Sequence, residues 1–174
     1  MRRFARRRRE QAFTLVELIL VMVVIFTLAT IIAPRFSDSF PSLQVRTSTE
    51  RLFAWARKAR SDAALTGSRQ RLILDSAKKK FWLEYEARPI KEPGKFTKLT
   101  GAWGEGWIPD EVSFETIEGA ETDPNNSAVR YLEFRPDGTS SEATVILSNE
   151  NGDRQTLRIE AATSKIYIEQ AKEE

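Results

Sequence analysis

The chain has 174 residues, which suits one globular domain with an appended segment. It contains no cysteine and no histidine, and this excludes disulfide bonds, nucleophile–base pairs that use Cys or His, and the usual zinc ligand sets. Residues 1–12 carry a net charge of +5 and the rest of the chain −3, so the sequence pI near 9.0 is no evidence for DNA binding.

An apolar stretch follows the arginine-rich leader and runs from Phe13 to Ala33 with one charged residue, Glu17. At about 1.5 Å rise per residue this stretch is long enough to span a hydrocarbon core as a helix. Arginines flank only its N-terminal end, which predicts a cytoplasmic N-terminus and an exported C-terminal part. An ionisable side chain within such a span is costly, so Glu17 indicates a function.

The residues alone leave three interpretations of this segment open. It is a signal peptide cut near residues 27–29, an uncut signal anchor, or a precursor cut between Ala12 and Phe13 that keeps the whole apolar helix. The first two leave Glu17 unexplained.

The sequence Ala-Phe-Thr-Leu-Val-Glu at residues 12–17, followed by the apolar run, resembles the N-terminus of type IV pilins and type II secretion pseudopilins. The resemblance implies that a prepilin peptidase cuts between Ala12 and Phe13 and that the new amino group of Phe13 is methylated. It also implies that Glu17 pairs with the Phe13 amine of a neighbouring subunit during filament assembly, and that Pro34 kinks the helix. Relatives usually carry glycine in place of Ala12, which implies slower processing here.

Beyond Pro34, residues 37–41 interrupt the helical pattern, because proline lacks a backbone donor and clashes with the preceding turn. Helical signals return over residues 42–66, and Gly67 is suited to end the helix. We expect one long kinked helix, with residues 13–33 in the membrane and residues 34–66 beyond it. Its apolar stripe comprises Leu43, Leu52, Phe53, Ala56, Ala59, Ala63 and Leu65.

Residues 67–174 predict an exported β-rich domain. Alternating patterns indicate a hairpin of residues 71–75 and 81–85, and further strands at 111–117, 129–134, 144–149, 155–161 and 166–168. Residues 88–106 read as a loop region with room for short strands, and residues 119–127 as a loop. Asn151-Gly152 is a strong hairpin turn. The fold class is therefore α+β, a helix packed on one or two antiparallel sheets.

The exported part extends the resemblance. Leu52 with Ala-Arg-Ser-Asp-Ala at residues 59–63, and Phe-x-Pro-Asp-Gly-Thr-Ser-Ser at residues 134–141, are similar to the H-type minor pseudopilins and their pilus-linked relatives. The last turn, residues 162–165, departs from the Gly-Arg pair that relatives often carry. The resemblance implies a pilin-like fold.

Candidate sites in the exported part are few. Trp103 and Trp107 are candidate partner contacts, with core capping as the alternative interpretation. Asp123-Pro124-Asn125-Asn126 offers oxygen ligands but too few for a calcium site, and Lys78-Lys79-Lys80 reads as a solvated turn. We predict no cofactor, no metal and no catalysis.

The resemblance favours a non-catalytic, tip-proximal minor pseudopilin of a type II protein secretion system. The alternatives are a minor pilin of a type IV pilus, with DNA capture through the basic region 57–80, and a membrane-anchored enzyme. The implied partners are other major and minor pseudopilins, the prepilin peptidase, the inner-membrane secretion platform and a secreted substrate contacted through residues 88–128. The implied location is the bacterial inner membrane, crossed once, with the C-terminal domain in the periplasm.

Overall fold

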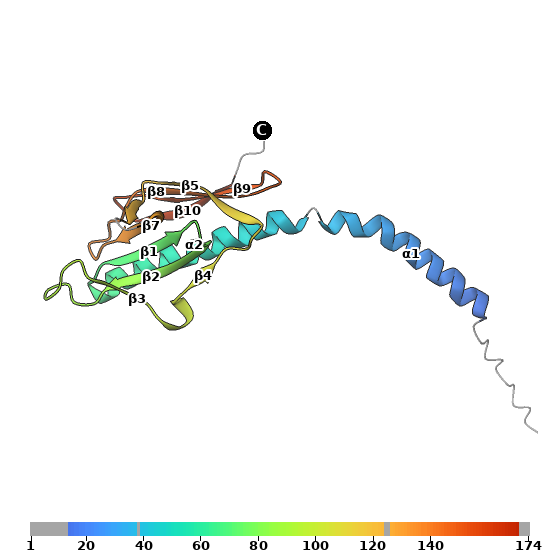
Figure 1. The fold of residues 1–174 in the computed structure, drawn as a ribbon, viewed down its shortest axis with the longest axis horizontal. Helices are drawn as coiled ribbons and strands as arrows, with labels where there is room; N and C mark the ends of the chain where they lie inside the picture. The colour runs from blue at the N-terminus through green and yellow to red at the C-terminus, as the bar shows by residue number, and fades with distance from the viewer. Residues whose placement is uncertain (1–13, 38, 124–125, 171–174) are drawn as a thin grey trace, which may run out of the picture. The chain divides into compact units, whose positions relative to one another are not determined.

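The structure, a computed structural model, describes residues 14–37, 39–123 and 126–170, and it divides into two units (Figure 1). The first, Met1–Ser39, contains helix α1, Leu15–Ser37. The second, Phe40–Glu174, contains the sheets and nearly all of helix α2, Ser39–Thr66. The predicted leader and the cleavage position lie outside the described residues.

Helix α2 begins three residues earlier than the sequence predicted, so Pro41 lies within its first turn. Pro41 is tolerated there because the first N–H groups of a helix have no acceptor within it, so the N–H that proline lacks costs no hydrogen bond. The C-terminal end agrees with the prediction. The Gly67 N–H donates to the Ala63 carbonyl at 3.1 Å, and Gly67 has a φ of 65°.

The buried face of α2 differs from the predicted stripe at both ends. Leu52, Ala56, Ala59 and Ala63 are buried as expected, and Val45 and Trp55 join them. Leu43 and Leu65 are instead 53% and 81% exposed. Helical spacing shows which residues share a face, but only the extent of the sheets decides how much of that face is covered.

Sheet A is antiparallel, with the strand order β3-β2-β1-β7-β6 and with β4 also paired to β2. Its strands are β1 Gln70–Asp75, β2 Lys80–Glu86, β3 Phe96–Lys98, β4 Gly106–Trp107, β6 Glu121–Asp123 and β7 Asn126–Phe134. The predicted hairpin is β1 and β2, with Ile73 opposite Trp82. Strand β6 lies in a region predicted as loop, because its short polar sequence has no alternation that would reveal it.

Sheet B is also antiparallel, with the order β10-β9-β8-β5. Its strands are β5 Val112–Glu118, β8 Ala143–Asn149, β9 Arg154–Ile159 and β10 Ile166–Gln170. All four were predicted, with boundary shifts of one or two residues. Along β8 every second residue is buried, from Ala143 to Asn149, so one face of the sheet supports the core.

The core joins α2 to both sheets. Side chains of α2, of β1, β2 and β7 in sheet A, and of all four strands of sheet B form one hydrophobic cluster. Phe81, Phe134 and Leu147 are among its largest fully buried members. The α+β prediction is therefore confirmed, with one helix packed on two antiparallel sheets.

Candidate functional site

The N-terminal end of α1 places Glu17 in the first helical turn. The Glu17 N–H donates to Thr14 Oγ1 at 3.2 Å, so Thr14 caps the helix. Thr-x-x-Glu is the capping-box pattern, and a carboxylate in the first turn also interacts favourably with the helix dipole. The chain thus supplies a local reason for a carboxylate at this position, which the sequence analysis missed although Thr14 and Glu17 have the required spacing.

The surface of α1 is almost wholly apolar. Its large apolar side chains from Leu15 to Leu28 are at least 47% exposed. The hydroxyl groups of Thr27 and Thr30 donate to the carbonyls of Val23 and Phe26 at 2.7 and 3.1 Å, so these polar groups are satisfied within the helix. An exposed apolar surface of this extent marks an interaction site.

Within residues 14–37, 39–123 and 126–170, no helix combines the length and the apolar character needed to cross a membrane. Pro34 lies inside α1, which continues to Ser37. The kink at Pro34 and the roles of Ala12 and Phe13 stay predictions.

The two tryptophans singled out in the sequence have different surroundings. The Trp103 ring packs edge-on against Trp55, with ring centroids 5.3 Å apart, and Trp55 packs in the same way against Phe81 at 5.0 Å. Trp103 therefore caps the core. Trp107, on strand β4, is 64% exposed and is available to a partner.

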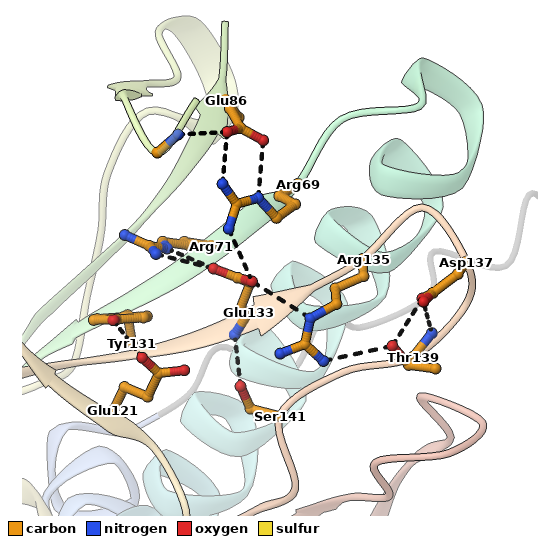
Figure 2. A network of polar contacts seen from close by, with 11 residues as sticks. Arg69, Arg71, Glu86, Glu121, Tyr131, Glu133, Arg135, Asp137, Thr139 and Ser141 are labelled. Atoms are coloured by element: carbon orange, nitrogen blue, oxygen red, sulfur yellow. Dashed lines mark hydrogen bonds and ion pairs between the residues drawn. The ribbon is translucent and has the colours of Figure 1, made fainter. Parts of the chain in front are cut away.

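A network of charged side chains on sheet A, absent from the sequence analysis, links strands β1, β2 and β7 (Figure 2). Arg69 forms a two-pronged ion pair with Glu86, with N–O distances of 2.9 and 2.6 Å. Arg71 donates twice to one oxygen of Glu133, at 3.0 and 2.9 Å. Arg69 and Arg135 approach the other oxygen of Glu133 at 3.6 and 3.5 Å, so three guanidinium groups surround one buried carboxylate.

The electrostatics of this network favour the charged form of Glu86. The hydrogen bond from Arg69 lowers the pKa of Glu86 from 4.5 to about 2, against the opposing effect of burial, and the Gly94 N–H donates to the same carboxylate at 2.6 Å. The hydrogen bond to Glu86 likewise raises the pKa of Arg69. With its pKa lowered, the Glu86 carboxylate is a poor proton acceptor near neutral pH, and the Gly94 contact ties the β2–β3 loop to the sheet.

Aromatic rings complete the network. The Arg71 guanidinium carbon lies 3.6 Å from the Phe96 ring centroid and 4.2 Å from that of Tyr131, so Arg71 stacks on both rings. The Tyr131 hydroxyl donates to Glu121, and this hydrogen bond raises the Tyr131 pKa. The spacing of Arg69 with Arg71 and of Glu133 with Arg135 could have signalled charges on one face of adjacent strands, but their partners depend on strand register.

The oxygen-bearing residues 123–126, which were judged too few for a calcium site, lie partly outside the described residues, since positions 124 and 125 are among those the structure does not describe. Among the described residues, no group of three or more carboxylates is arranged to hold a metal ion.

Comparisons with known proteins bear on both units. Residues 7–33 match the prokaryotic N-terminal methylation motif. The solved structure of the minor pseudopilin EpsH from the type 2 secretion system of Vibrio cholerae aligns with a TM-score of 0.59 at 10% identity, over 75% of this chain and 99% of EpsH. The solution structure of Escherichia coli GspH aligns with a TM-score of 0.56 at 15% identity, over 78% and 94% of the two chains.

The globular unit has the fold of the minor pseudopilins. The type IV minor pilin FimU of Pseudomonas aeruginosa aligns with a TM-score of 0.47 at 17% identity, over 74% of this chain and 90% of FimU. At this score the alignment is not used to assign the fold. A search of curated proteins finds no match. The N-terminal motif and the fold are therefore the two findings from which a function is inferred.

Proposed function

We propose that this chain is a minor pseudopilin of a type II protein secretion system, a structural subunit of a filament. The observation that carries the proposal is the combination of an N-terminal methylation motif over residues 7–33 with a globular unit of minor-pseudopilin fold. Either feature alone would fit other exported proteins.

In this proposal residues 1–12 are a leader that the prepilin peptidase removes, and Phe13 becomes the methylated first residue. Residues 13–33 anchor the subunit in the bacterial inner membrane, and the unit from Phe40 onward lies in the periplasm. The exposed apolar side chains of α1 support this role, because such a helix needs lipid or other helices around it. Its partners are then other major and minor pseudopilins and the inner-membrane secretion platform.

Glu17 has a defined part in the assembly step. A carboxylate in an apolar environment needs a cation, and the Phe13 amine of a neighbouring subunit supplies one. The Thr14 hydroxyl caps the first turn of α1, and Glu17 lies in that turn. A pair of this kind specifies register more than it adds net stability.

The charged network on sheet A supports a structural role for the globular unit. Its carboxylates Glu86 and Glu133 are paired with arginines, and its contacts join strands and a loop. We accordingly propose no catalytic activity, and we place the specificity of the subunit in the surface of the globular unit.

The deciding experiment is the mass and N-terminal sequence of the protein extracted from membranes. We expect a chain that begins at methylated Phe13. Replacement of Ala12 by glycine, the residue usual in relatives, is the matched variant and should be processed at least as fast. A native chain that begins at Thr30, without the apolar segment, contradicts the proposal.

A further inference from the structure

We infer that two copies of the globular unit form a two-fold dimer, in which Trp107 of each copy inserts into a pocket between α2 and Pro109 of the other. The pocket contains a buried hydrogen-bond acceptor that has no partner within the described residues, and the exposed indole of Trp107 carries a matching donor. The inference goes beyond the proposed function and rests on it only for the membrane that confines the two copies.

The pocket lies on the first half of α2 and has a volume of about 220 Å³. This volume is below the roughly 300–1,000 Å³ of small-molecule sites and suits one large side chain. Its helical wall is made of residues that recur at helical spacing and so share one face of α2. The lining residues are Leu43, Gln44, Thr47, Ser48, Arg51 and Pro109.

Gln44 gives this pocket an acceptor without a donor. Its Oε1 atom is buried and has no hydrogen-bond partner among the residues that the structure describes. Burial of an unpaired oxygen is costly, and nearly all such groups in folded proteins have a partner. A side chain that carries an N–H group into the pocket removes this cost.

Three features of the pocket match an indole ring. Leu43 and Pro109 supply apolar contact, and the Gln44 oxygen accepts one hydrogen bond. Arg51 supplies a guanidinium group, which stacks favourably on aromatic rings. Tryptophan is the side chain that combines a large apolar ring with a single N–H donor. A carboxylate ligand, in contrast, brings no donor for the Gln44 oxygen.

Trp107 is the tryptophan available for this role. The sequence contains four tryptophans. Trp55 lies in the core at 8% exposure, and Trp103 packs against it. The Trp82 N–H donates to Glu84 at 2.8 Å. Trp107 is instead 64% exposed, so its ring can enter a second molecule.

Trp107 lies close to the pocket of its own copy, and its backbone is fixed there. Pro109 follows it by two positions, at most about 7 Å along the chain. Between them Ile108 is 3% exposed, and its N–H donates to the Lys79 carbonyl at 2.8 Å. Strand β4 pairs with β2, which places Trp107 opposite Lys80. The anchor and the pocket therefore belong to one surface.

An anchor and a matching pocket on one surface favour a second copy as the occupant. In a two-fold dimer the same patch faces itself, so both insertions form together. The surroundings carry both signs of charge. Arg51 lines the pocket, and Lys79 donates to the Asp110 carbonyl. Asp110 and Glu111 follow Pro109 in sequence. Such a surface can pair with itself, whereas a lipid or nucleic-acid surface of one sign would repel part of it.

The contact is small, so isolated units associate weakly. Two inserted indoles and the rims around them bury less than the roughly 1,200 Å² of standard interfaces, which is typical of transient complexes. In the proposed function both copies are anchored in one membrane, and this confinement raises their effective concentration. The dimer is therefore best tested both in the membrane and in concentrated solution.

The first test uses the full chain in its native membrane. Trp107 is replaced by benzoylphenylalanine, a photoreactive aromatic residue. We expect irradiation to give a product of twice the chain mass, in which the cross-linked peptide of the second copy contains residues 43–51. The matched control carries the same photoreactive residue in place of Ile90, which is 95% exposed, and should give no such product.

The second test measures self-association of residues 40–174, which contain every residue of the hydrophobic core, by NMR diffusion. Trp107→Ala removes both anchors of the dimer and should weaken association more than about 100-fold. Leu65→Ala is the matched control, because Leu65 is an 81% exposed apolar residue near the other end of α2. It should leave the association unchanged.

A double-mutant cycle tests the hydrogen bond to Gln44. Trp107→Phe keeps an aromatic ring without the N–H, and Gln44→Met removes the acceptor at a similar shape. Each variant loses both symmetric hydrogen bonds and should weaken association about tenfold. Because the two variants remove the same bonds, the double variant should also lose about tenfold rather than about 100-fold. Circular dichroism checks that all variants are folded.

Three results would overturn the inference. They are a unit that stays monomeric in concentrated solution while the membrane yields no product of doubled mass, self-association that Trp107→Ala leaves unchanged, and a photoproduct that joins position 107 to lipid or to a different protein in place of a second copy. Additive losses in the cycle would overturn the pairing with Gln44. A monomeric unit in a chain that begins at methylated Phe13 would leave the proposed function intact, so the two failures are distinguishable.

Discussion

In α1, the large apolar side chains from Leu15 to Leu28 are 47–77% exposed, whereas in the globular unit Leu72, Phe81 and Leu147 are at most 1% exposed. Both regions are rich in apolar residues, but only the globular unit brings elements distant in sequence against one another. Its apolar area is removed from water by its own chain, and this burial stabilises the unit without a partner.

Helix α1 depends on what surrounds it. Its backbone and its threonine hydroxyls are satisfied internally, so its outer surface offers almost nothing but apolar contact. The difference in exposure between the two regions shows that apolar content alone does not identify a hydrophobic core. A region that cannot bury its own apolar surface must obtain burial from its surroundings, which in the proposed function are lipid and other subunits. The following predictions test this contrast.

The largest expected effect is on assembly, from replacement of Glu17 by valine. In the pairing proposed above, loss of Glu17 leaves a buried charge without its partner, which costs about 3–5 kcal/mol, so incorporation into filaments should fall about 100-fold or more. Membrane insertion should be unchanged because the variant segment is more apolar. Cross-linking to neighbouring subunits in membranes measures the effect, and normal co-assembly of the variant would argue against the pairing.

The next largest effect is on stability, where truncation of a core side chain and truncation of an α1 side chain should have different effects on the free energy of unfolding. We expect Phe81→Ala to lower the free energy of unfolding by about 3–5 kcal/mol, because Phe81 is fully buried and packs against Trp55. The matched change in α1 is Leu20→Ala, which should alter unfolding of the globular unit by less than about 0.5 kcal/mol. Urea denaturation compares the two, and similar effects would show that the units are not independent.

Removal of one carboxylate from the charged network should have an intermediate effect on the free energy of unfolding, and this effect should depend on pH. Glu86→Gln should cost about 2 kcal/mol, because it weakens charge-assisted hydrogen bonds with Arg69 and Gly94. The folded-state pKa of Glu86 is lowered from 4.5 to about 2, so its contribution is complete above pH 4.5 and is lost as the pH falls toward 2.

The measurement for this prediction is urea denaturation of both proteins from pH 7 to pH 2. The stability difference between wild type and Glu86→Gln should be constant from pH 7 to about pH 5 and then shrink. A difference that stays the same down to pH 2 would show that ionisation of Glu86 does not contribute.

The smallest effect concerns a single turn. Gly138 has a φ of 85° and open space around the position of a Cβ, so Gly138→Ala should cost about 1 kcal/mol through backbone strain alone. Thermal unfolding measures it. Asp137→Ala is the companion variant, since the Asp137 carboxylate accepts hydrogen bonds from the Thr139 N–H and hydroxyl in the same turn. Unchanged stability of the Gly138→Ala variant would mean that the backbone of the turn adjusts without strain.

Local patterns were sufficient for much of the architecture. The apolar run of α1, the glycine that ends α2 and the alternation along β1, β2, β8 and β9 are properties of neighbouring residues, and each predicted its element correctly. The N-terminal motif is likewise a contiguous signal, and the family comparison matches it over residues 7–33. Such features need no tertiary information because their physical cause lies within a few residues.

Other features depended on which segments the fold brings together. The separation of Trp103 in the core from Trp107 at the surface, and the three arginines around Glu133, follow from strand register and from the reach of α2. Burial of Leu52 but not of Leu65 has the same origin. The spacing of a side chain indicates which face of its own helix or strand it occupies. The surface that packs against that face is formed by residues far away in sequence, so only the tertiary structure decides what lies there.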